Sequence, residues 1–124
     1  MSKMTGLAHI GIFVKSFEKS NPFYIDLLGF EFIDKWNNLE FLKVGSCILE
    51  LIEQPDLPAR EAGPVDHIAI EVEGIDELYE KLKKNNVPLL GEVGTMSELL
   101  GGVKNLFFIG PDGERLEFFE YINK

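Results

Sequence analysis

Short stretches of the chain alternate apolar and polar residues, and this period of two is typical of half-buried strands. In the first half, the alternation predicts strands at 7–14, 30–36, 39–44 and 47–53. In the second half, it predicts strands at 65–73, 88–93, 103–109 and 114–122. Segments rich in Asn, Gly and Pro separate these stretches, as expected of turns between strands.

Two other segments place their apolar residues at helical spacing. After the first strand, apolar residues at 23, 27 and 28 predict a helix with Ser20 or Asn21 as its N-cap and Gly29 at its end. In the second half, apolar residues from Ile75 to Leu82 predict a helix that ends at 85–86. Each half of the chain therefore has the predicted order strand, helix and three strands.

The two halves also share sequence. The run HIGIFV at 9–14 recurs as HIAIEV at 67–72, and LELIE at 49–53 recurs as LEFFE at 116–120. Their shared order and similar separation indicate a duplicated unit. We therefore predict an α+β fold for a single domain of residues 1–124, with modules 5–54 and 65–122 joined by a linker at 55–64. Two such βαβββ modules side by side form a curved, mostly antiparallel sheet with helices on its convex face.

The chain has two histidines, and each opens the first strand of one repeat. The period of two places His9 and His67 on the face opposite the β-branched residues that pack on the helices. The closing strands carry Glu50 and Glu117 among apolar neighbours, where a carboxylate is costly unless it is paired or bound to metal. Two imidazoles and two carboxylates that converge at a pseudo-twofold predict a divalent-metal site with open positions for water or a chelating substrate.

Each of these residues also has an ordinary structural interpretation. A lone histidine at the start of a strand is usually structural, and either glutamate could lie at a solvated strand end. The conjunction of all four at equivalent positions of a repeat favours the metal site. Among neighbouring residues, we expect Cys47 in the core, Glu53 and Glu120 on the surface, and Asp66 on the face opposite His67.

Composition and charge restrict the partners. The chain has 12 Lys and Arg against 21 Asp and Glu, which gives a formal net charge of −9 and argues against nucleic-acid binding. No apolar stretch approaches the ~20 residues of a membrane span, and the first six residues lack the apolar segment of a signal peptide. The single cysteine excludes a disulfide framework within the chain. We therefore expect a cytoplasmic protein that binds neither nucleic acid nor membrane.

With these residues in place, the chain resembles glyoxalase I (lactoylglutathione lyase) of the vicinal-oxygen-chelate superfamily. The segment from His9 to Phe30 matches the N-terminal signature of that family, and the PDG at 111–113 followed by LE at 116–117 resembles its characteristic ending. The resemblance covers essentially the whole chain. It implies that the ligands of one metal ion are His9, Glu50, His67 and Glu117.

The resemblance further implies a cytoplasmic, metal-dependent lyase, usually a homodimer, with Ni²⁺ or Co²⁺ favoured and Zn²⁺ as the alternative. Its substrate is the hemithioacetal of methylglyoxal and a thiol, and a metal-bound glutamate moves a proton between adjacent carbons through an enediolate. Glu117 is the first choice for this base, and Glu50 is its symmetry mate. Phe13 and Phe119 are candidate walls of the substrate site. The repeat permits a metal site within one chain or across a dimer.

Two departures leave the identity of the thiol open. Glyoxalases that use glutathione usually carry an arginine where this chain has Phe13 and an asparagine where it has Gln54. The alternatives are an acyl-CoA epimerase of the methylmalonyl-CoA type, another metalloenzyme of the superfamily, or a drug-binding protein of the bleomycin-resistance type. Epimerases of that family often have Gln at the position of Glu50, and the drug-binding proteins lack the ligands. Dioxygenases and fosfomycin-modifying enzymes typically use three protein ligands.

Overall fold

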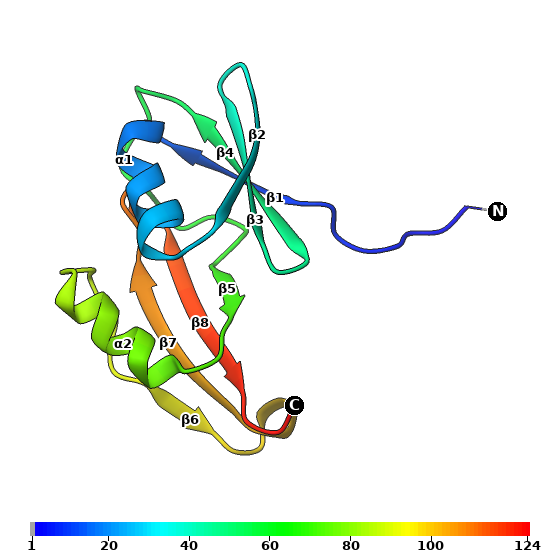
Figure 1. Cartoon of the computed structure of the whole chain (residues 1–124), viewed down its shortest axis with the longest axis vertical. Coiled ribbons are helices and arrows are strands. Elements are labelled where there is room, and N and C mark those ends of the chain that lie inside the picture. The colour runs from blue at the N-terminus through cyan, green and yellow to red at the C-terminus, as the bar shows by residue number, and fades with distance from the viewer. Residues whose placement is uncertain (1) are drawn as a thin grey trace. The chain divides into compact units, whose positions relative to one another are not determined.

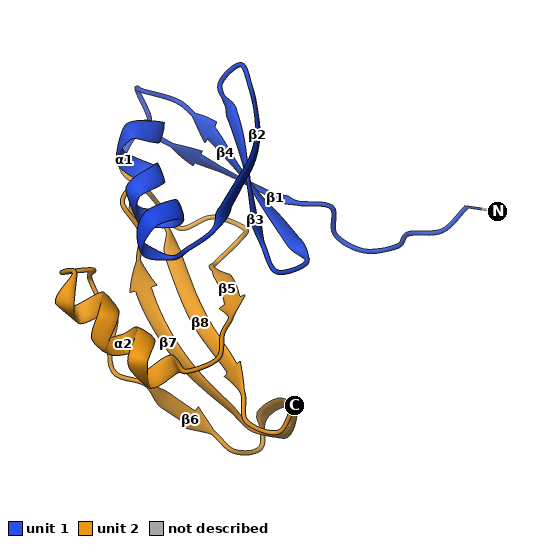
Figure 2. Ribbon diagram, viewed as in Figure 1, with its two compact units in different colours: residues 1–58 blue, residues 59–124 orange. Residues whose placement is uncertain are grey.

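The computed structural model describes residues 2–124 (Figure 1). The chain divides into two compact units, the first ending at Pro58 and the second comprising Ala59–Lys124 (Figure 2). The boundary lies in the segment that the sequence assigns as a linker. Each unit contains a strand, a helical segment and three further strands, so the α+β fold built from two βαβββ modules is confirmed.

The first unit forms a four-stranded mixed sheet in the order β1-β4-β3-β2. Strand β1 runs parallel to β4, whereas β3 is antiparallel to both of its neighbours. Its elements are β1 (Ile10–Val14), α1 (Phe17–Asn21), the π-helical segment η1 (Pro22–Leu27), β2 (Glu31–Trp36), β3 (Leu39–Val44) and β4 (Cys47–Glu53).

The second unit repeats this topology, with strand order β5-β8-β7-β6 and a parallel pairing of β5 with β8. Its elements are β5 (Ile68–Glu71), α2 (Ile75–Lys84), β6 (Gly94–Met96), the 3₁₀ turn η2 (Leu99–Gly101), β7 (Val103–Ile109) and β8 (Arg115–Tyr121). The parallel pairing of first and last strands recurs in both units. This shared feature supports duplication at the level of topology as well as sequence.

One predicted strand is wrong. The segment 88–93 contributes only an isolated bridge between Leu89 and Phe108, and β6 begins after it, at Gly94. Pro88 has no N–H to donate, and Gly91 adopts a φ of +138°, so the segment cannot continue a regular ladder. It still follows β7, because the Leu90 amide donates to the Phe107 carbonyl at 2.9 Å.

The predicted start of the first helix is also wrong. Ser16 is the N-cap, and its hydroxyl accepts a hydrogen bond from the Lys19 amide at 3.2 Å. Ser20, predicted as a cap, lies buried inside α1, and Pro22 begins the wider turn of η1. Gly29 follows the helical segment with a φ of +79°, which agrees with its predicted role at the helix end.

Each unit has its own core on one face of its sheet. In the second unit, α2 packs on β7 and β8 and buries Ile75 and Leu82 (Figure 1). Apart from Val103 at the start of β7, the buried apolar strand residues occupy alternate positions, as the period of two requires: Ile12, Val14, Leu42, Leu49 and Leu51 in the first unit, and Ile70, Leu106, Phe108, Leu116 and Phe118 in the second. The face that carries the histidines and the candidate glutamates is therefore the face away from each core.

Two glutamates predicted on the surface instead bind the start of the helix in their own unit. Glu53 accepts a hydrogen bond from the Phe17 amide at 2.9 Å. Glu120, at the equivalent position, accepts from the amides of Gly74 and Ile75 at 2.9 and 3.2 Å. Both side chains are half-buried. The free N–H groups and the dipole of the helix N-terminus stabilise the carboxylate there, which offsets the cost of its partial burial.

The prediction of a buried Cys47 is wrong as well. The thiol is exposed because Cys47 is the first residue of β4, directly after the turn at 45–46. Within residues 2–124, no helix combines the length and apolar character needed to cross a bilayer.

Candidate functional site

The first unit brings His9 next to Glu50. The parallel register of β1 and β4 places Gly11 opposite Glu50, and His9 lies just before β1 on the same face. The His9 Nε2 atom is 3.4 Å from Glu50 Oε1. A Cβ on Gly11 would lie 2.9 Å from the same oxygen, so the missing side chain leaves room for the carboxylate.

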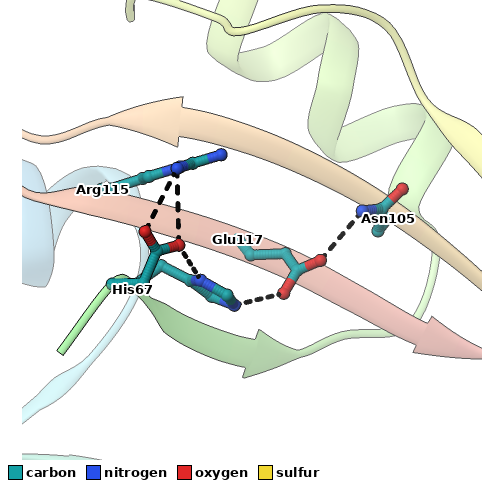
Figure 3. A network of polar contacts seen from close by, with 5 residues as sticks. His67, Asn105, Arg115 and Glu117 are labelled. Carbon is teal, nitrogen blue, oxygen red and sulfur yellow. Dashed lines mark hydrogen bonds and ion pairs between the residues drawn. The ribbon is translucent and has the colours of Figure 1, made fainter. Parts of the chain in front are cut away.

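The second unit brings His67 next to Glu117 in the same way. The parallel register of β5 and β8 places Ala69 opposite Glu117. His67 Nε2 lies 3.1 Å from Glu117 Oε1 (Figure 3). Glu117 is the more buried of the two carboxylates, with 7% of its side chain exposed against 15% for Glu50.

The spacing within each pair fits two ligands of one ion. Donors that each lie about 2.1 Å from a metal are about 3.0 Å apart at octahedral angles and about 3.4 Å apart at tetrahedral angles. The observed separations of 3.4 and 3.1 Å fall in that range. Among residues 2–124, no group of three or more His, Cys, Asp or Glu side chains is placed to hold an ion. Each unit supplies two donors, and a site that uses all four stays a prediction.

Asp66 contacts the other nitrogen of the His67 ring, which corrects the prediction that it points away. The distance from Asp66 Oδ2 to His67 Nδ1 is 2.7 Å. The strand begins only at Ile68, so strict alternation of side chains does not apply at Asp66. The hydrogen bond from His67, and secondarily the positive charge of Arg115, hold the pKa of Asp66 below its ordinary value. An Arg115 nitrogen lies 3.4 Å from the Asp66 carboxylate.

The contact with Asp66 also bears on the fit of a cation. When Nδ1–H donates to Asp66, a neutral His67 ring presents the lone pair of Nε2 to the Glu117 carboxylate. Two acceptors 3.1 Å apart repel each other unless a proton or a cation lies between them. The donor set of the second unit therefore suits a bound divalent ion.

Asn105 is a site residue that sequence reasoning missed. Its side-chain amide on β7 donates to Glu117 Oε2 at 2.9 Å, on the side of the carboxylate away from His67 (Figure 3). The pairing of β7 with β8 places Asn105 opposite Phe119, two residues from Glu117 on the same face. A polar residue among the apolar residues of the strand predicted at 103–109 was the available signal, but only the register shows which side chain it reaches.

Aromatic rings flank both histidines at equivalent positions, and sequence reasoning missed these too. Phe41 pairs with Glu50 across β3 and β4, and its ring meets His9 edge to face with centroids 6.3 Å apart. Phe107 pairs with Glu117 and meets His67 in the same orientation at 5.0 Å. These contacts restrict the orientation of the imidazoles on the open face of each sheet.

The two predicted substrate-contacting residues lie on the same faces as the pairs. Phe13 is 48% exposed and lies opposite Ile52 in the register of β1 and β4. Phe119 is half-buried and contacts the Tyr121 ring edge to face at 5.3 Å. Their contact with a substrate stays a prediction.

The sequence and fold of this chain are similar to those of known proteins. A family model described as the Glyoxalase/Bleomycin resistance protein/Dioxygenase superfamily matches residues 6–118. A lactoylglutathione lyase of Neisseria meningitidis is 30% identical over 125 residues, with 92% of this chain and 89% of the relative covered. The metallothiol transferase FosB of Staphylococcus haemolyticus is 29% identical over 115 residues, with 90% and 81% covered. The crystal structure of a glyoxalase family protein from Enterococcus faecalis superposes with a TM-score of 0.77 at 28% identity, over 93% of this chain and 97% of that one.

Proposed function

Because the chain belongs to the glyoxalase/bleomycin resistance protein/dioxygenase superfamily, we propose that it is a metal-dependent lyase of the glyoxalase I type. Its reaction is the conversion of the hemithioacetal of methylglyoxal and a thiol to the S-lactoyl thioester. The observation that carries the proposal is the recurrence of a His–Glu pair, at ligand-like spacing, on the open face of both sheets. The similarity to a lactoylglutathione lyase supports it.

The proposed centre contains one divalent ion held by His9, Glu50, His67 and Glu117. Imidazole and carboxylate donors suit Ni²⁺ and Co²⁺, with Zn²⁺ as the alternative. These four donors would hold the ion, and it would bind the two neighbouring oxygens of the substrate. The four residues come from one chain or from the two chains of a homodimer, and the ligand set is the same in both arrangements.

The bound ion supplies Lewis acidity to the two substrate oxygens. The chain supplies the proton transfer: a carboxylate oxygen of Glu50 or Glu117 removes the proton from the carbon that bears the sulfur. The same carboxyl group returns the proton to the adjacent carbon, so the product is an isomer and no other reactant is needed. A positioned general base of this kind contributes about 10²- to 10⁴-fold in rate.

The thiol part of the substrate is the least specified. Phe13 and Gln54 stand where glutathione-dependent relatives usually carry an arginine and an asparagine, and Arg115 is engaged by Asp66. Phe13 and Phe119 are the proposed apolar walls for the substrate. We therefore expect small thiols other than glutathione to be accepted at least as well as glutathione.

Thiol transfer is the second candidate function, because FosB is similar to this chain to almost the same degree as the lyase. A thiol transferase needs an electrophilic second substrate, such as an epoxide, and forms a new carbon–sulfur bond. The lyase needs only the hemithioacetal. The four ligands proposed for this chain, rather than three, favour the lyase.

The test is to load the full chain separately with Ni²⁺, Co²⁺ and Zn²⁺ and to assay methylglyoxal with glutathione and with other small thiols. The proposal predicts thioester formation that depends on metal, with no turnover of methylmalonyl-CoA or of fosfomycin with a thiol. Glu117→Gln should keep the fold and abolish turnover, and unchanged activity would exclude Glu117 from the centre. A protein that binds no stoichiometric metal would instead indicate a drug-binding protein.

A further inference from the structure

The two His–Glu pairs are alike in backbone register but differ in the residues around them. Asn105 lies opposite Phe119, and the equivalent residue of the first unit, opposite Ile52, is Leu39. The residues before the two histidines are Asp66 and Ala8. Polar partners therefore surround the pair of the second unit, whereas apolar side chains occupy the corresponding positions of the first.

We propose that Asn105 is a positioning residue that fixes Glu117 as a ligand, and that Glu50 is the carboxylate that exchanges the proton. The inference deepens the proposed function and rests on it, because it assigns different roles to two glutamates that the sequence makes equivalent. It also reverses the preference for Glu117 as the base that the family resemblance suggests.

Both oxygens of Glu117 are engaged. Oε1 lies 3.1 Å from His67 Nε2, and Oε2 accepts the amide hydrogen of Asn105 at 2.9 Å. Rotation of the carboxylate toward a substrate would break the bond to Asn105 in a position where the side chain is nearly buried. Outer hydrogen bonds of this kind orient the ligands of a metal and raise its affinity. His67 is oriented similarly through Asp66, at 2.7 Å.

Glu50 is held by fewer contacts. Oε1 lies 3.4 Å from His9 Nε2, and 15% of the Glu50 side chain is exposed, against 7% for Glu117. Leu39 cannot supply the amide that Asn105 supplies in the other unit. Gly11 lies under the carboxylate, where the second unit has the Cβ of Ala69. A carboxylate that is more exposed than Glu117 and has a leucine in place of the supporting amide can turn from the ion toward the substrate carbon and back.

The experiment replaces Asn105 by the residue of the first unit, Asn105→Leu, in the full chain. We expect Co²⁺ binding, measured by calorimetry, to weaken about 10- to 100-fold, and the visible absorption of the Co²⁺ protein to change. Repeating the substitution in Glu117→Gln should change the affinity less than about twofold, because Asn105 acts through Glu117. Lys104→Leu, at the neighbouring position of β7 and paired with Asp76 instead, is the matched control and should leave binding unchanged.

The second arm compares Glu50→Gln with Glu117→Gln. Glu50→Gln should lose turnover and weaken Co²⁺ binding less than Glu117→Gln does. Unchanged Co²⁺ binding in Asn105→Leu, an equal loss in the Glu117→Gln background, or turnover by Glu50→Gln overturns the inference. Asn105→Ala serves the same purpose if the leucine variant does not fold. A wild-type chain that binds no Co²⁺ overturns the proposed function itself. That result differs from Co²⁺ binding that is unchanged by Asn105→Leu, which overturns only the inference.

Discussion

The two units of this chain have the same strand order and the same parallel pairing of first and last strands. The side chains that surround their His–Glu pairs, however, are different. In the second unit, Asp66 contacts His67, and Asn105 donates a hydrogen bond to Glu117. In the first unit, Ala8 and Leu39 stand at those positions, and the Glu50 carboxylate lies against Gly11, which has no side chain. Duplication thus preserved the backbone that aligns histidine with glutamate, while the neighbouring side chains diverged.

This difference indicates where symmetry matters for function and where it does not. A metal needs donors at fixed spacing, and two copies of one strand pairing supply that spacing twice. Proton transfer needs one carboxylate that can move while the ion stays bound. In the proposed mechanism, a duplicated unit in which an amide holds one carboxylate and a leucine replaces that amide beside the other satisfies both requirements.

The largest expected effect lies in the two cores. Leu42 and Phe108 occupy equivalent buried positions of β3 and β7, opposite Leu49 and Leu116. Phe108→Ala should lower the free energy of unfolding by about 3–5 kcal/mol and Leu42→Ala by about 2–5 kcal/mol, because each leaves a cavity. Urea unfolding followed by circular dichroism measures both. A cost below 1 kcal/mol for either would show that its unit is not held by this core.

The next largest effect is expected when the first unit is given the side-chain amide that Asn105 supplies in the second unit. Leu39→Asn should hold Glu50 as Asn105 holds Glu117. We expect kcat for the hemithioacetal to fall about 10-fold while Co²⁺ affinity stays equal or rises, because an added outer hydrogen bond favours the ligand role. Steady-state kinetics and calorimetry on the same preparation check this. Wild-type kcat together with tighter Co²⁺ binding would contradict the mobile role of Glu50.

The helix-binding glutamates give a smaller difference between the units. Glu120 accepts two amide hydrogen bonds at the start of α2, whereas Glu53 accepts one at the start of α1. We expect Glu120→Ala to cost about 1–2 kcal/mol of unfolding free energy and Glu53→Ala about 0.5–1 kcal/mol. Denaturant titration of both variants, with the exposed Glu92→Ala as control, measures the order. Equal costs would show that the second hydrogen bond adds nothing.

The smallest effect concerns the residue beneath each carboxylate. Gly11→Ala would place a Cβ 2.9 Å from Glu50 Oε1, so the end of this flexible side chain must shift. We expect Co²⁺ affinity to fall about threefold, less than the roughly 10-fold cost of losing a supporting hydrogen bond. The reverse change, Ala69→Gly, should leave affinity within about twofold. Calorimetry of both variants would reveal an error in the account if Ala69→Gly had the larger effect.

The sequence predicted the parts that depend on local periodicity. Alternation placed β3, β4 and β7 at their observed bounds and set His9 and Glu50 on the face away from the core. The alternation of side chains did not predict the orientation of Asp66, because this residue precedes the regular strand and turns toward His67. It also failed at 88–93, where a proline and a glycine prevent a ladder.

Contacts between strands could not be predicted from one sequence. That Asn105 reaches Glu117 depends on the register of β7 against β8, and a shift of two residues would remove the contact. The roles of Glu53 and Glu120 depend likewise on where each helix begins relative to the closing strand. A repeat in the sequence identified equivalent positions, but only the tertiary structure shows how their surroundings differ.

The metal content of the purified full chain tests the central claim most directly. If His9, Glu50, His67 and Glu117 hold one ion together, elemental analysis after loading with Co²⁺ or Ni²⁺ gives one ion per chain, and either His9→Ala or His67→Ala removes most of it. Two ions per chain, or His9→Ala and His67→Ala proteins that each keep a full ion, would show that the two pairs act separately and would contradict a shared centre.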